Sequence, residues 1–332
     1  IKNRKAQRTK NLMELTKYSK YRRILTGSPV TKSPLDLYSQ CNFLDERSLG
    51  YQSFFAFQNR YAIVQTRVMG ARSFQEITGY RRLDELNKRL FSFSTRVLKD
   101  ECLDLPEKMY IRRNVPLTME QSKVYAQMNS LALAHLNDDK VATTASVLTQ
   151  IMRLQQICCG SFQPDVGDLQ ELKNKRLPEL MDIVDEVSGK AIIWATYTND
   201  IQRIAHALRD RFGPESVATY YGATPQKERQ EIVNRFQDED SPLRFFVGQP
   251  KTGGYGITLT AANTVIYYSN SYDLEIRLQS EDRAHRIGQR NPVTYIDLVS
   301  PNTIDETILD ALRNKINLAG QVLKEDVKAW LR

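Results

Sequence analysis

Five short apolar runs in the second half of the chain constrain its fold more than any other feature. From Lys190 on, the runs AIIWAT, SVATYY, LRFFVGQ, NTVIYYS and VTYIDLV recur with helical segments between them. Short apolar runs bounded by turns are typical of strands buried on both faces, and strands that alternate with helices form parallel sheets. Between the strands, Ile201, Ile204 and Leu208 fall on one helical face. The sequence therefore predicts an α/β fold in which helices cover a parallel sheet.

The first half of the chain has a different pattern. Residues 4–19 are basic and compatible with a helix, and RRILTGSP predicts a short buried strand that ends in a Gly-Ser-Pro turn. Residues 34–100 contain amphipathic stretches but few strand-like runs, so we expect them to be mainly helical. The stretch Thr118–Cys159 predicts two further helices. With 332 residues, the chain is long enough for about two domains.

Composition excludes several classes of protein. Hydrophobic residues make up 41% of the chain and charged residues 26%, which excludes a disordered or collagen-like chain. No apolar run approaches the roughly 20 residues that cross a bilayer, and the first residues, IKNRKAQRTK, lack the apolar core of a signal peptide. We therefore expect no membrane contact and a protein that is not secreted but is either cytoplasmic, in association with the nucleoid, or nuclear. No metal site is expected either, because no ligand pattern joins the cysteines and histidines, which are Cys41, Cys102, Cys158, Cys159, His135, His206 and His285.

The net charge of +8 is concentrated near the N-terminus. Nine basic residues and one acid lie between Lys2 and Arg23, and the rest of the chain is neutral overall. Such a stretch either binds a polyanion or forms a solvated helix face, and charge alone favours the solvated face.

The string QSEDRAHRIGQ, residues 279–289, is the most informative motif. If its first part is helical, the spacings of four and three residues place Gln279, Arg283 and Arg286 on one face. Two guanidinium groups directed to one place match a dense anion such as a phosphate. The alternative is a solvated helix whose arginines pair with Glu281 and Asp282.

The string PKTGGYGITLT forms a glycine loop between two predicted strands. Its glycines at positions 253, 254 and 256 permit close approach of the backbone to a ligand, but a tight connection in a sheet explains them equally well. The loop is neither a GxGxxG fingerprint nor a Walker loop.

The order of the motifs identifies a resemblance. ILTGSP, RVLKDECLDLPEK, KAIIWATYT, YYGATPQKERQEIVNRF, KTGGYGITLTAANTVIYYS and QSEDRAHRIGQ together resemble the Swi/Snf family of helicase-like ATPases of superfamily two. The resemblance implies RecA-like parallel-sheet lobes with helical insertions, a cleft for ATP and a monomeric motor that moves along double-stranded DNA. It identifies no protein partner. The rival interpretation is a non-catalytic module that binds DNA or a partner.

The resemblance also implies residue roles. Gln279, Arg283 and Arg286 match motif VI and would act on the phosphates of ATP. The glycines of motif V, Gly254 and Gly256, would border both ATP and DNA. Motif III would couple nucleotide state to lobe movement through Thr26, Gly27, Ser28 and Pro29. The residues implied in DNA binding are Thr196, Thr198, Gly222, Thr224, Lys251, Thr252 and Tyr272.

The chain departs from the family pattern at several positions. Lys251 replaces the usual arginine, Thr258 the usual asparagine and Tyr272 a tryptophan that meets DNA. An aromatic side chain at position 272 still permits stacking or groove contact. DLEIRL follows Tyr272 in place of the usual Asn-Pro-Gln run.

Two motifs of such an ATPase are absent from the sequence. No GxxxxGK[ST] string occurs, and Gly189-Lys190 precedes a predicted strand when a Walker loop must follow one. No DEAH-type box occurs either, and IKNRKA resembles the segment that follows this box in the family. We therefore expect a piece of a larger enzyme, a DNA-dependent ATPase that uses ATP and Mg²⁺. The piece alone would bind neither tightly and would not hydrolyse ATP.

The resemblance also predicts the division of the chain. Residues 1–45 would form the end of the first RecA-like lobe, residues 46–95 its helical protrusion and residues 96–117 the crossing between lobes. Residues 118–332 would form the second lobe, with a helical insertion at 118–160 and a C-terminal brace at 311–332.

Overall fold

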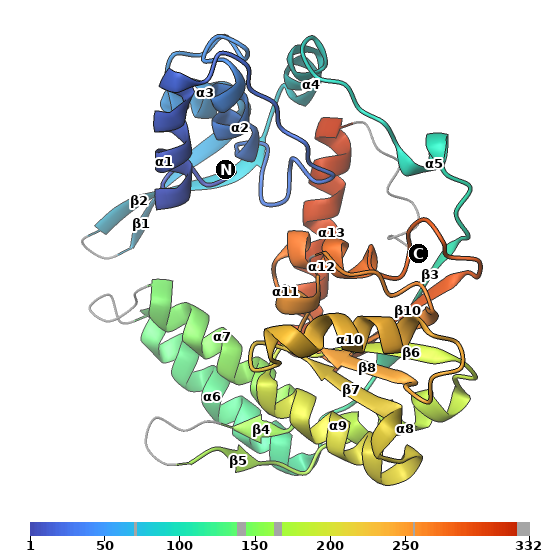
Figure 1. The fold of residues 1–332 in the computed structure, drawn as a ribbon. Coiled ribbons are helices and arrows are strands. Elements are labelled where there is room, and N and C mark those ends of the chain that lie inside the picture. The colour runs from blue at the N-terminus through green and yellow to red at the C-terminus, as the bar shows by residue number, and fades with distance from the viewer. Residues whose placement is uncertain (70–71, 138–143, 163–167, 255, 324–332) are drawn as a thin grey trace. The chain divides into compact units, whose positions relative to one another are not determined.

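The structure is a computed structural model that describes residues 1–69, 72–137, 144–162, 168–254 and 256–323 (Figure 1). These residues form two compact units. Unit 1 comprises Ile1–Leu98, Asp273–Glu275 and the described residues from Leu312 on, and unit 2 comprises the described residues of Lys99–Tyr272 and Ile276–Ala311.

Unit 2 is built on a six-stranded sheet in which every neighbouring pair of strands is parallel. The strand order is β3-β10-β9-β6-β8-β7. The strands are β3 (Lys108–Asn114), β6 (Lys190–Trp194), β7 (Val217–Tyr220), β8 (Phe245–Gly248), β9 (Ala262–Tyr267) and β10 (Val293–Val299). The five apolar runs from Lys190 on are therefore strands, and the predicted α/β fold is confirmed.

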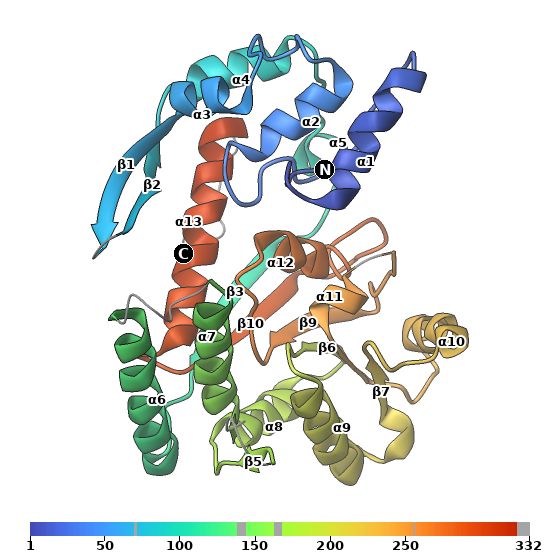
Figure 2. The ribbon, with the colours of Figure 1, turned by 90° about the vertical axis from the view of Figure 1, so that its left-hand side faces the viewer.

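Strands β6–β10 of this sheet are mostly buried on both faces because their side chains alternate between two cores, whereas the edge strand β3 is partly exposed. Ala191 and Ile193 of β6 pack with helices α8 (Arg176–Glu186) and α9 (Thr198–Phe212). Ile192 and Trp194 pack on the other face with α10 (Gln226–Gln237). Figures 1 and 2 show these helices on the two faces.

The remaining elements of unit 2 lie before β6 and around the later strands. A pair of helices, α6 and α7, corresponds to the two helices predicted at Thr118–Cys159. These elements are α5 (Lys99–Cys102), α6 (Met119–Asn137), α7 (Thr144–Cys159), β4 (Ser161–Phe162), β5 (Gln170–Glu171), the 3₁₀-helix η2 (Pro214–Ser216), α11 (Pro250–Gly253) and α12 (Leu274–Glu281), whose residues from Ile276 on belong to unit 2. Helix α13 (Ile304–Leu323) begins in unit 2, and its residues from Leu312 on belong to unit 1.

Unit 1 combines helices with one antiparallel hairpin. Its core contains Leu37, Phe57, Tyr61, Leu86 and Val322. Figure 2 shows the hairpin extending beyond the neighbouring helices. The elements are α1 (Gln7–Leu15), η1 (Thr16–Tyr18), α2 (Asp36–Leu44), α3 (Phe54–Tyr61), β1 (Ala62–Met69), β2 (Arg72–Tyr80) and α4 (Leu83–Phe91).

One prediction for this half of the chain is incomplete and another is wrong. Residues 34–100 form helices as expected, but they also contain strands β1 and β2, which pair along their length. RRILTGSP is not a buried strand, since it has no regular secondary structure and Leu25 is 98% exposed. An apolar run forms a strand only where a neighbouring strand accepts its backbone hydrogen bonds, and none pairs with this segment in the described part of the chain.

The compact units divide the chain differently from the predicted boundaries in several places, one of which is the assignment of Asp273–Glu275 to unit 1. Strand β3 lies within the predicted crossing 96–117 but belongs to the sheet of unit 2. The described residues of the predicted brace fall mostly in unit 1, where Asn87 Nδ2 donates to the Val322 carbonyl at 2.7 Å. The functional boundaries themselves stay predictions. No helix among the described residues is long and apolar enough to cross a membrane.

Candidate functional site

The two motif VI arginines lie on a turn that follows helix α12. This helix ends at Glu281, so the prediction that Gln279, Arg283 and Arg286 share one helical face is wrong for the arginines. The turn nevertheless brings them together, because Arg283 Nη1 and Arg286 Nη1 both donate to the carbonyl oxygen of Ile257, at 3.1 and 3.3 Å. Arg283 Nε also donates to the Gln279 carbonyl at 2.8 Å. We call residues 282–289 the arginine turn.

The electrostatics of the arginine turn suit an anion. Burial and the nearby Arg286 charge lower the pKa of Arg283 below its ordinary value, against a smaller opposite effect of Asp282. The acids that could neutralise the arginines have other partners. Asp282 accepts a hydrogen bond from Lys99 Nζ at 2.6 Å, and Glu281 accepts one from Arg277 Nε at 2.8 Å. This arrangement disfavours the solvated helix with paired charges.

Buried polar contacts fix the arginine turn to the sheet. The Gln289 side-chain amide donates to the carbonyls of Thr260, Ala262 and Ala284 at 2.9–3.2 Å. The backbone N–H of Leu259 donates to the Arg283 carbonyl at 2.9 Å. His285 Nε2 lies 2.7 Å from the Pro106 carbonyl oxygen, and burial lowers the pKa of this imidazole, so it donates this hydrogen bond as the neutral ring.

The glycine loop has a shape that only glycine permits at two positions. A Cβ on Gly254 would lie 2.5 Å from the Pro250 carbonyl oxygen, and Gly256 has a φ of +72°. Lys251 is exposed, whereas the Thr252 hydroxyl donates to Gln249 Oε1 at 3.2 Å. Ile257, which accepts from both arginines, directly follows Gly256. The loop therefore connects the exposed Lys251 to the arginine turn.

The predicted DNA-contact residues of unit 2 follow the carboxyl ends of neighbouring strands, where parallel sheets place their ligand sites. Thr196 follows β6 and Thr198 begins α9. Gln249, which directly follows β8, links these segments: its Nε2 donates to the Thr196 carbonyl and its N–H to the Tyr220 carbonyl, both at 3.0 Å. Sequence reasoning missed Gln249, although its place at a strand end is a signal that could have identified it.

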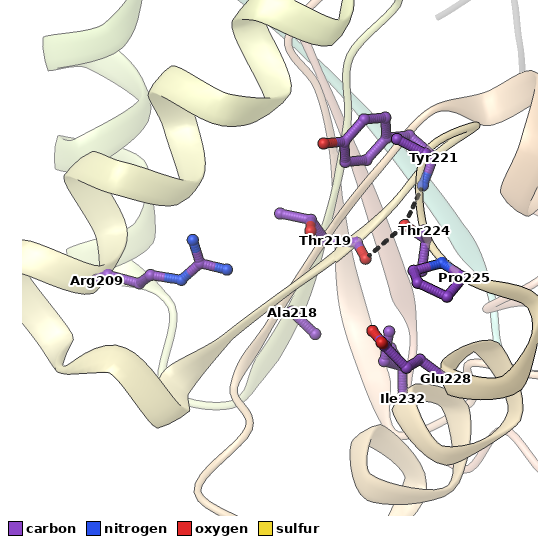
Figure 3. Close-up of a pocket in the computed structure, with 9 residues that line it drawn as sticks. Arg209, Ala218, Thr219, Tyr221, Thr224, Pro225, Glu228 and Ile232 are labelled. Carbon is purple, nitrogen blue, oxygen red and sulfur yellow. Dashed lines mark hydrogen bonds between the residues drawn. The ribbon is translucent and has the colours of Figure 1, made fainter.

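Gly222 and Thr224 lie on the turn after β7. Gly222 is exposed, but Thr224 is buried and its hydroxyl closes the turn, accepting from the Tyr221 N–H at 3.0 Å and donating to the Thr219 carbonyl at 3.2 Å (Figure 3). A pocket of about 290 Å³ lies beside this turn. Figure 3 shows Arg209 on one side of it and Glu228 on the other. Contact of Thr224 with DNA stays a prediction.

The last predicted DNA contact, Tyr272, is half-buried after β9, where burial and the nearby Asp305 raise its pKa. Hydrogen bonds fix two residues between the end of β9 and Tyr272. Ser269 Oγ accepts from the Thr196 N–H at 2.8 Å, and Gln155 Nε2 donates to the Asn270 carbonyl at 2.7 Å. The phenol at position 272 therefore follows an anchored segment.

The motif III residues belong to unit 1. Thr26 and Gly27 are exposed, and the Thr26 hydroxyl accepts from the Ser28 N–H at 3.2 Å. Gln40 Nε2 donates to the Pro29 carbonyl at 2.8 Å. Most basic side chains between Lys2 and Arg23 are exposed as well. Both segments are accessible to a ligand, and their roles stay predictions.

The described residues offer little for a metal. No three His, Cys, Asp or Glu side chains among them gather into a possible site. Burial raises the pKa of the Cys41 and Cys158 thiols to about 12, so these thiols are protonated at neutral pH. Cys102 is exposed.

A buried ion-pair network beneath α12 was not predicted. Arg277 donates to both carboxylate oxygens of Asp297 at 2.5 and 3.0 Å and to Asn270 Oδ1 at 2.6 Å. Its guanidinium lies 3.5 Å from the centre of the Tyr267 ring. Burial opposes the charge of Arg277, but the neighbouring acids raise its pKa well above its ordinary value. The network fixes the helix that leads into the arginine turn.

The comparison with known families agrees with this geometry. Residues 1–163 match the SNF2-related domain, and residues 172–288 match the helicase conserved C-terminal domain. The chain belongs to the Swi/Snf family of helicase-like ATPases. The second match contains the glycine loop and nearly all of the arginine turn.

Individual members of the Swi/Snf family support the assignment. The chain is 28% identical over 312 residues to YwqA of Bacillus subtilis, covering 91% of this chain and 32% of YwqA. It is 26% identical over 328 residues to the transcription regulatory protein SNF2 of Saccharomyces cerevisiae, covering 92% and 19%. The chain thus spans a third or less of these two relatives.

A solved structure of the same family is also similar. The SWI2/SNF2 ATPase core of Sulfolobus solfataricus, determined in complex with double-stranded DNA, is 26% identical with a TM-score of 0.53. The match covers all of this chain and 68% of that core. The RecA-like fold of unit 2 is therefore that of Swi/Snf ATPases.

Proposed function

We propose that the chain is the C-terminal part of an ATP-dependent translocase that moves along double-stranded DNA. In this proposal, unit 2 is the second RecA-like lobe, and a further lobe holds the nucleotide. The observation that carries the proposal is the pair of guanidinium groups on one carbonyl oxygen, that of Ile257. Membership of the Swi/Snf family and similarity to an ATPase core solved with double-stranded DNA support it.

The arginine turn is proposed to act on the phosphates of ATP. Arg283 and Arg286 are half-buried, and their neighbouring acids are engaged by Lys99 and Arg277. Planar guanidinium forks fit phosphate oxygens and stabilise the charge that develops during phosphoryl transfer. Gln279 would orient the turn through its carbonyl, which accepts from Arg283 Nε.

The phosphate cradle itself does not belong to this chain. A Walker loop supplies backbone amides, a lysine and a magnesium-binding hydroxyl, and no such string occurs in the 332 residues. The chain would therefore supply the arginines, and the further lobe would hold ATP and Mg²⁺. We expect the chain alone to bind neither tightly.

The loops after β6, β7 and β8 are proposed to hold the DNA backbone. Thr198, Gly222 and Lys251 are exposed and lie on loops that Gln249 joins. Thr196, Thr252 and Tyr272 lie on the same loops or on the neighbouring one. Such contacts to phosphates carry no sequence information, which suits a motor that passes over any sequence.

Ile257 offers a route by which DNA could stimulate ATP hydrolysis. Its carbonyl accepts from both arginines, and it lies six residues after Lys251 on the glycine loop. A shift of this loop on DNA would move the acceptor that the arginines share. We propose that the glycine loop couples DNA binding to the position of the arginine turn. We propose further that the first lobe couples nucleotide state to lobe movement through Thr26, Gly27, Ser28 and Pro29.

The cellular setting is part of the proposal. A motor on double-stranded DNA works in the nucleus or on a nucleoid, and we propose such a location and a monomeric motor. A non-catalytic module that binds DNA or a partner is the alternative.

Measurement of ATP turnover separates the two functions. We expect DNA-stimulated ATP hydrolysis by the full-length protein, and hydrolysis no faster than background by residues 1–332 alone. Turnover by the isolated chain that Arg286→Ala abolishes would contradict the division of roles between the lobes. No turnover by the full-length protein with any DNA would favour the non-catalytic module.

A further inference from the structure

The hydroxyl of Tyr295 meets the backbone where helix α12 ends and the arginine turn begins. Tyr295 lies on β10 with its side chain fully buried, and its hydroxyl donates to the carbonyl oxygen of Glu281 at 3.0 Å. The same carbonyl accepts the backbone N–H groups of Ala284 and His285, both at 3.2 Å. Three donors therefore converge on the last residue of the helix, and two of them belong to the turn that carries Arg283 and Arg286.

The side chain of Glu281 is held as firmly as its backbone. The Tyr110 hydroxyl donates to Glu281 Oε2 at 2.8 Å, and Arg277 Nε donates to Oε1 at 2.8 Å. Burial acts to raise the pKa of this carboxyl, but Lys108 and Arg277 outweigh it, so the pKa lies below its ordinary value and the group is ionised. The rings of Tyr110 and Tyr295 stack with centres 5.2 Å apart. Both tyrosines thus approach one residue from neighbouring strands.

We infer that Tyr295 is a positioning residue for the arginine turn, acting through the carbonyl of Glu281, and that Tyr110 supports it through the side chain of the same glutamate. The inference rests on the proposed function, because it assigns the turn a task in phosphoryl transfer. A turn that begins at a fixed carbonyl places Arg283 and Arg286 reproducibly. Loss of the Tyr295 hydroxyl leaves the helix in place but lets the start of the turn vary.

Tyr295→Phe tests the inference because it removes one hydroxyl and retains the stacked ring. Tyr268→Phe is a matched control: this tyrosine is equally buried, and its hydroxyl also donates to a backbone carbonyl, that of Cys159, at 3.2 Å. Both variants, together with Tyr110→Phe, are made in the full-length protein. DNA-stimulated kcat, the DNA concentration at half-maximal turnover and the thermal unfolding midpoint are measured for each.

We expect Tyr295→Phe to lower kcat by roughly tenfold or more, since small misplacements of catalytic groups have effects of this size. Binding of ADP with aluminium fluoride, which mimics the transferring phosphoryl group, should weaken by a similar factor, and binding of ADP alone should not. Amide hydrogen exchange at Ala284 and His285 should become faster. Tyr268→Phe should change only the unfolding midpoint, and Tyr110→Phe should resemble Tyr295→Phe with a smaller loss of kcat.

Two results overturn the inference. One is equal kcat for Tyr295→Phe and Tyr268→Phe at equal unfolding midpoints, because the hydroxyl would then be merely structural. The other is an unfolded Tyr295→Phe protein combined with a fully active Tyr110→Phe protein. Arg286→Ala, measured in parallel, separates this failure from failure of the proposed function. Normal turnover by Arg286→Ala contradicts the role of the arginine itself. Loss of turnover in Arg286→Ala, together with normal turnover in Tyr295→Phe, overturns only the positioning role of Tyr295.

Discussion

Arg283 and Arg286 share one hydrogen-bond acceptor, the carbonyl oxygen of Ile257. A carbonyl oxygen has two lone pairs and can accept from both guanidinium groups, but it carries no net charge to neutralise them. The proximity of the two cations contributes to the lowered pKa of Arg283. The pair is therefore brought together by geometry and retains its attraction for an anion.

The first prediction concerns these arginines in the full-length protein. Arg283→Ala and Arg286→Ala should each reduce DNA-stimulated ATP turnover by about 10³- to 10⁵-fold, equivalent to about 4–7 kcal/mol of transition-state stabilisation. DNA affinity without nucleotide should stay within a few-fold of the wild-type value, because many contacts to the DNA backbone contribute to duplex binding. Steady-state turnover and DNA affinity are measured on the same variants.

Substitution by lysine provides the control for charge. Arg283→Lys and Arg286→Lys should restore little turnover, because a point charge does not reproduce a planar fork. A variant with normal turnover at saturating DNA and tenfold weaker DNA binding would show that its arginine contacts DNA.

Strands β6–β10 could be predicted because nearly all of their residues are buried. Phe245, Phe246 and Val247 of β8 are all fully buried, which leaves an uninterrupted apolar run in the sequence. The hairpin of unit 1 has no such signal. Val68 and Phe74 are exposed on it, and its Arg67–Glu76 ion pair joins residues of opposite strands. Its residues are held by cross-strand partners, which a periodic pattern does not reveal.

The arginine turn shows the same limit within the candidate site. The spacing of Arg283 and Arg286 correctly predicted that they meet, but it extended the helix past Glu281. At the end of the helix, the carbonyl of Glu281 also accepts the hydroxyl of Tyr295, a contact from another strand that spacing does not reveal. Gln249 and Arg277 were missed for the same reason, since each has a partner 20 or more residues away, Thr196 for Gln249 and Asp297 for Arg277. Motif residues can be found from spacing, whereas the residues that hold them depend on tertiary contacts.

The second prediction concerns DNA binding by the glycine loop. Lys251→Ala should lower the slope of log affinity against log salt concentration by about 0.9, the value for loss of one phosphate contact on duplex DNA. Fluorescence anisotropy with DNA of several sequences measures the slope. Lys173→Ala removes an exposed lysine outside the loops that follow the strands and should leave the slope unchanged. A strong preference for one DNA sequence that survives high salt would argue against a translocase.

The third prediction is a pH dependence of stability from Asp200. Burial raises the pKa of this carboxyl to about 6, although Arg203 and Arg176 act in the opposite direction. The folded state therefore retains the proton to higher pH than the unfolded state, and stability falls as pH rises from about 4 to about 6. A shift of the Asp200 pKa from the ordinary value of 3.8 to about 6 corresponds to a loss of folding stability on the order of 3 kcal/mol across this pH range.

Asp200→Asn should remove this dependence. Urea unfolding between pH 4 and pH 7 should show that the stability difference between the variant and the wild type moves in favour of the variant as pH rises. Asp240→Asn, at an exposed position, should follow the wild type throughout. A constant difference between Asp200→Asn and the wild type would contradict the prediction.

The fourth prediction concerns the buried ion pair of Arg277 and Asp297. Arg277→Met should destabilise the folded chain by about 3–5 kcal/mol, because it leaves the buried carboxylate of Asp297 without its cation and removes one of the two cations beside Glu281. Asp297→Leu should have a similar effect, since Arg277 then loses the carboxylate that accepts two of its hydrogen bonds. Urea unfolding at neutral pH measures both losses.

The double variant Arg277→Met with Asp297→Leu distinguishes pairing from packing. It should lose clearly less stability than the sum of the single losses, because the two charges then leave the interior together. Recovery should be incomplete, since Glu281 keeps Lys108 and Tyr110 but still lacks Arg277. Arg235→Met breaks an exposed pair with Glu215 and should cost no more than about 1 kcal/mol. Strict additivity of the two single losses would mean that Arg277 and Asp297 stabilise the fold independently, and that the network does not act as one unit beneath the arginine turn.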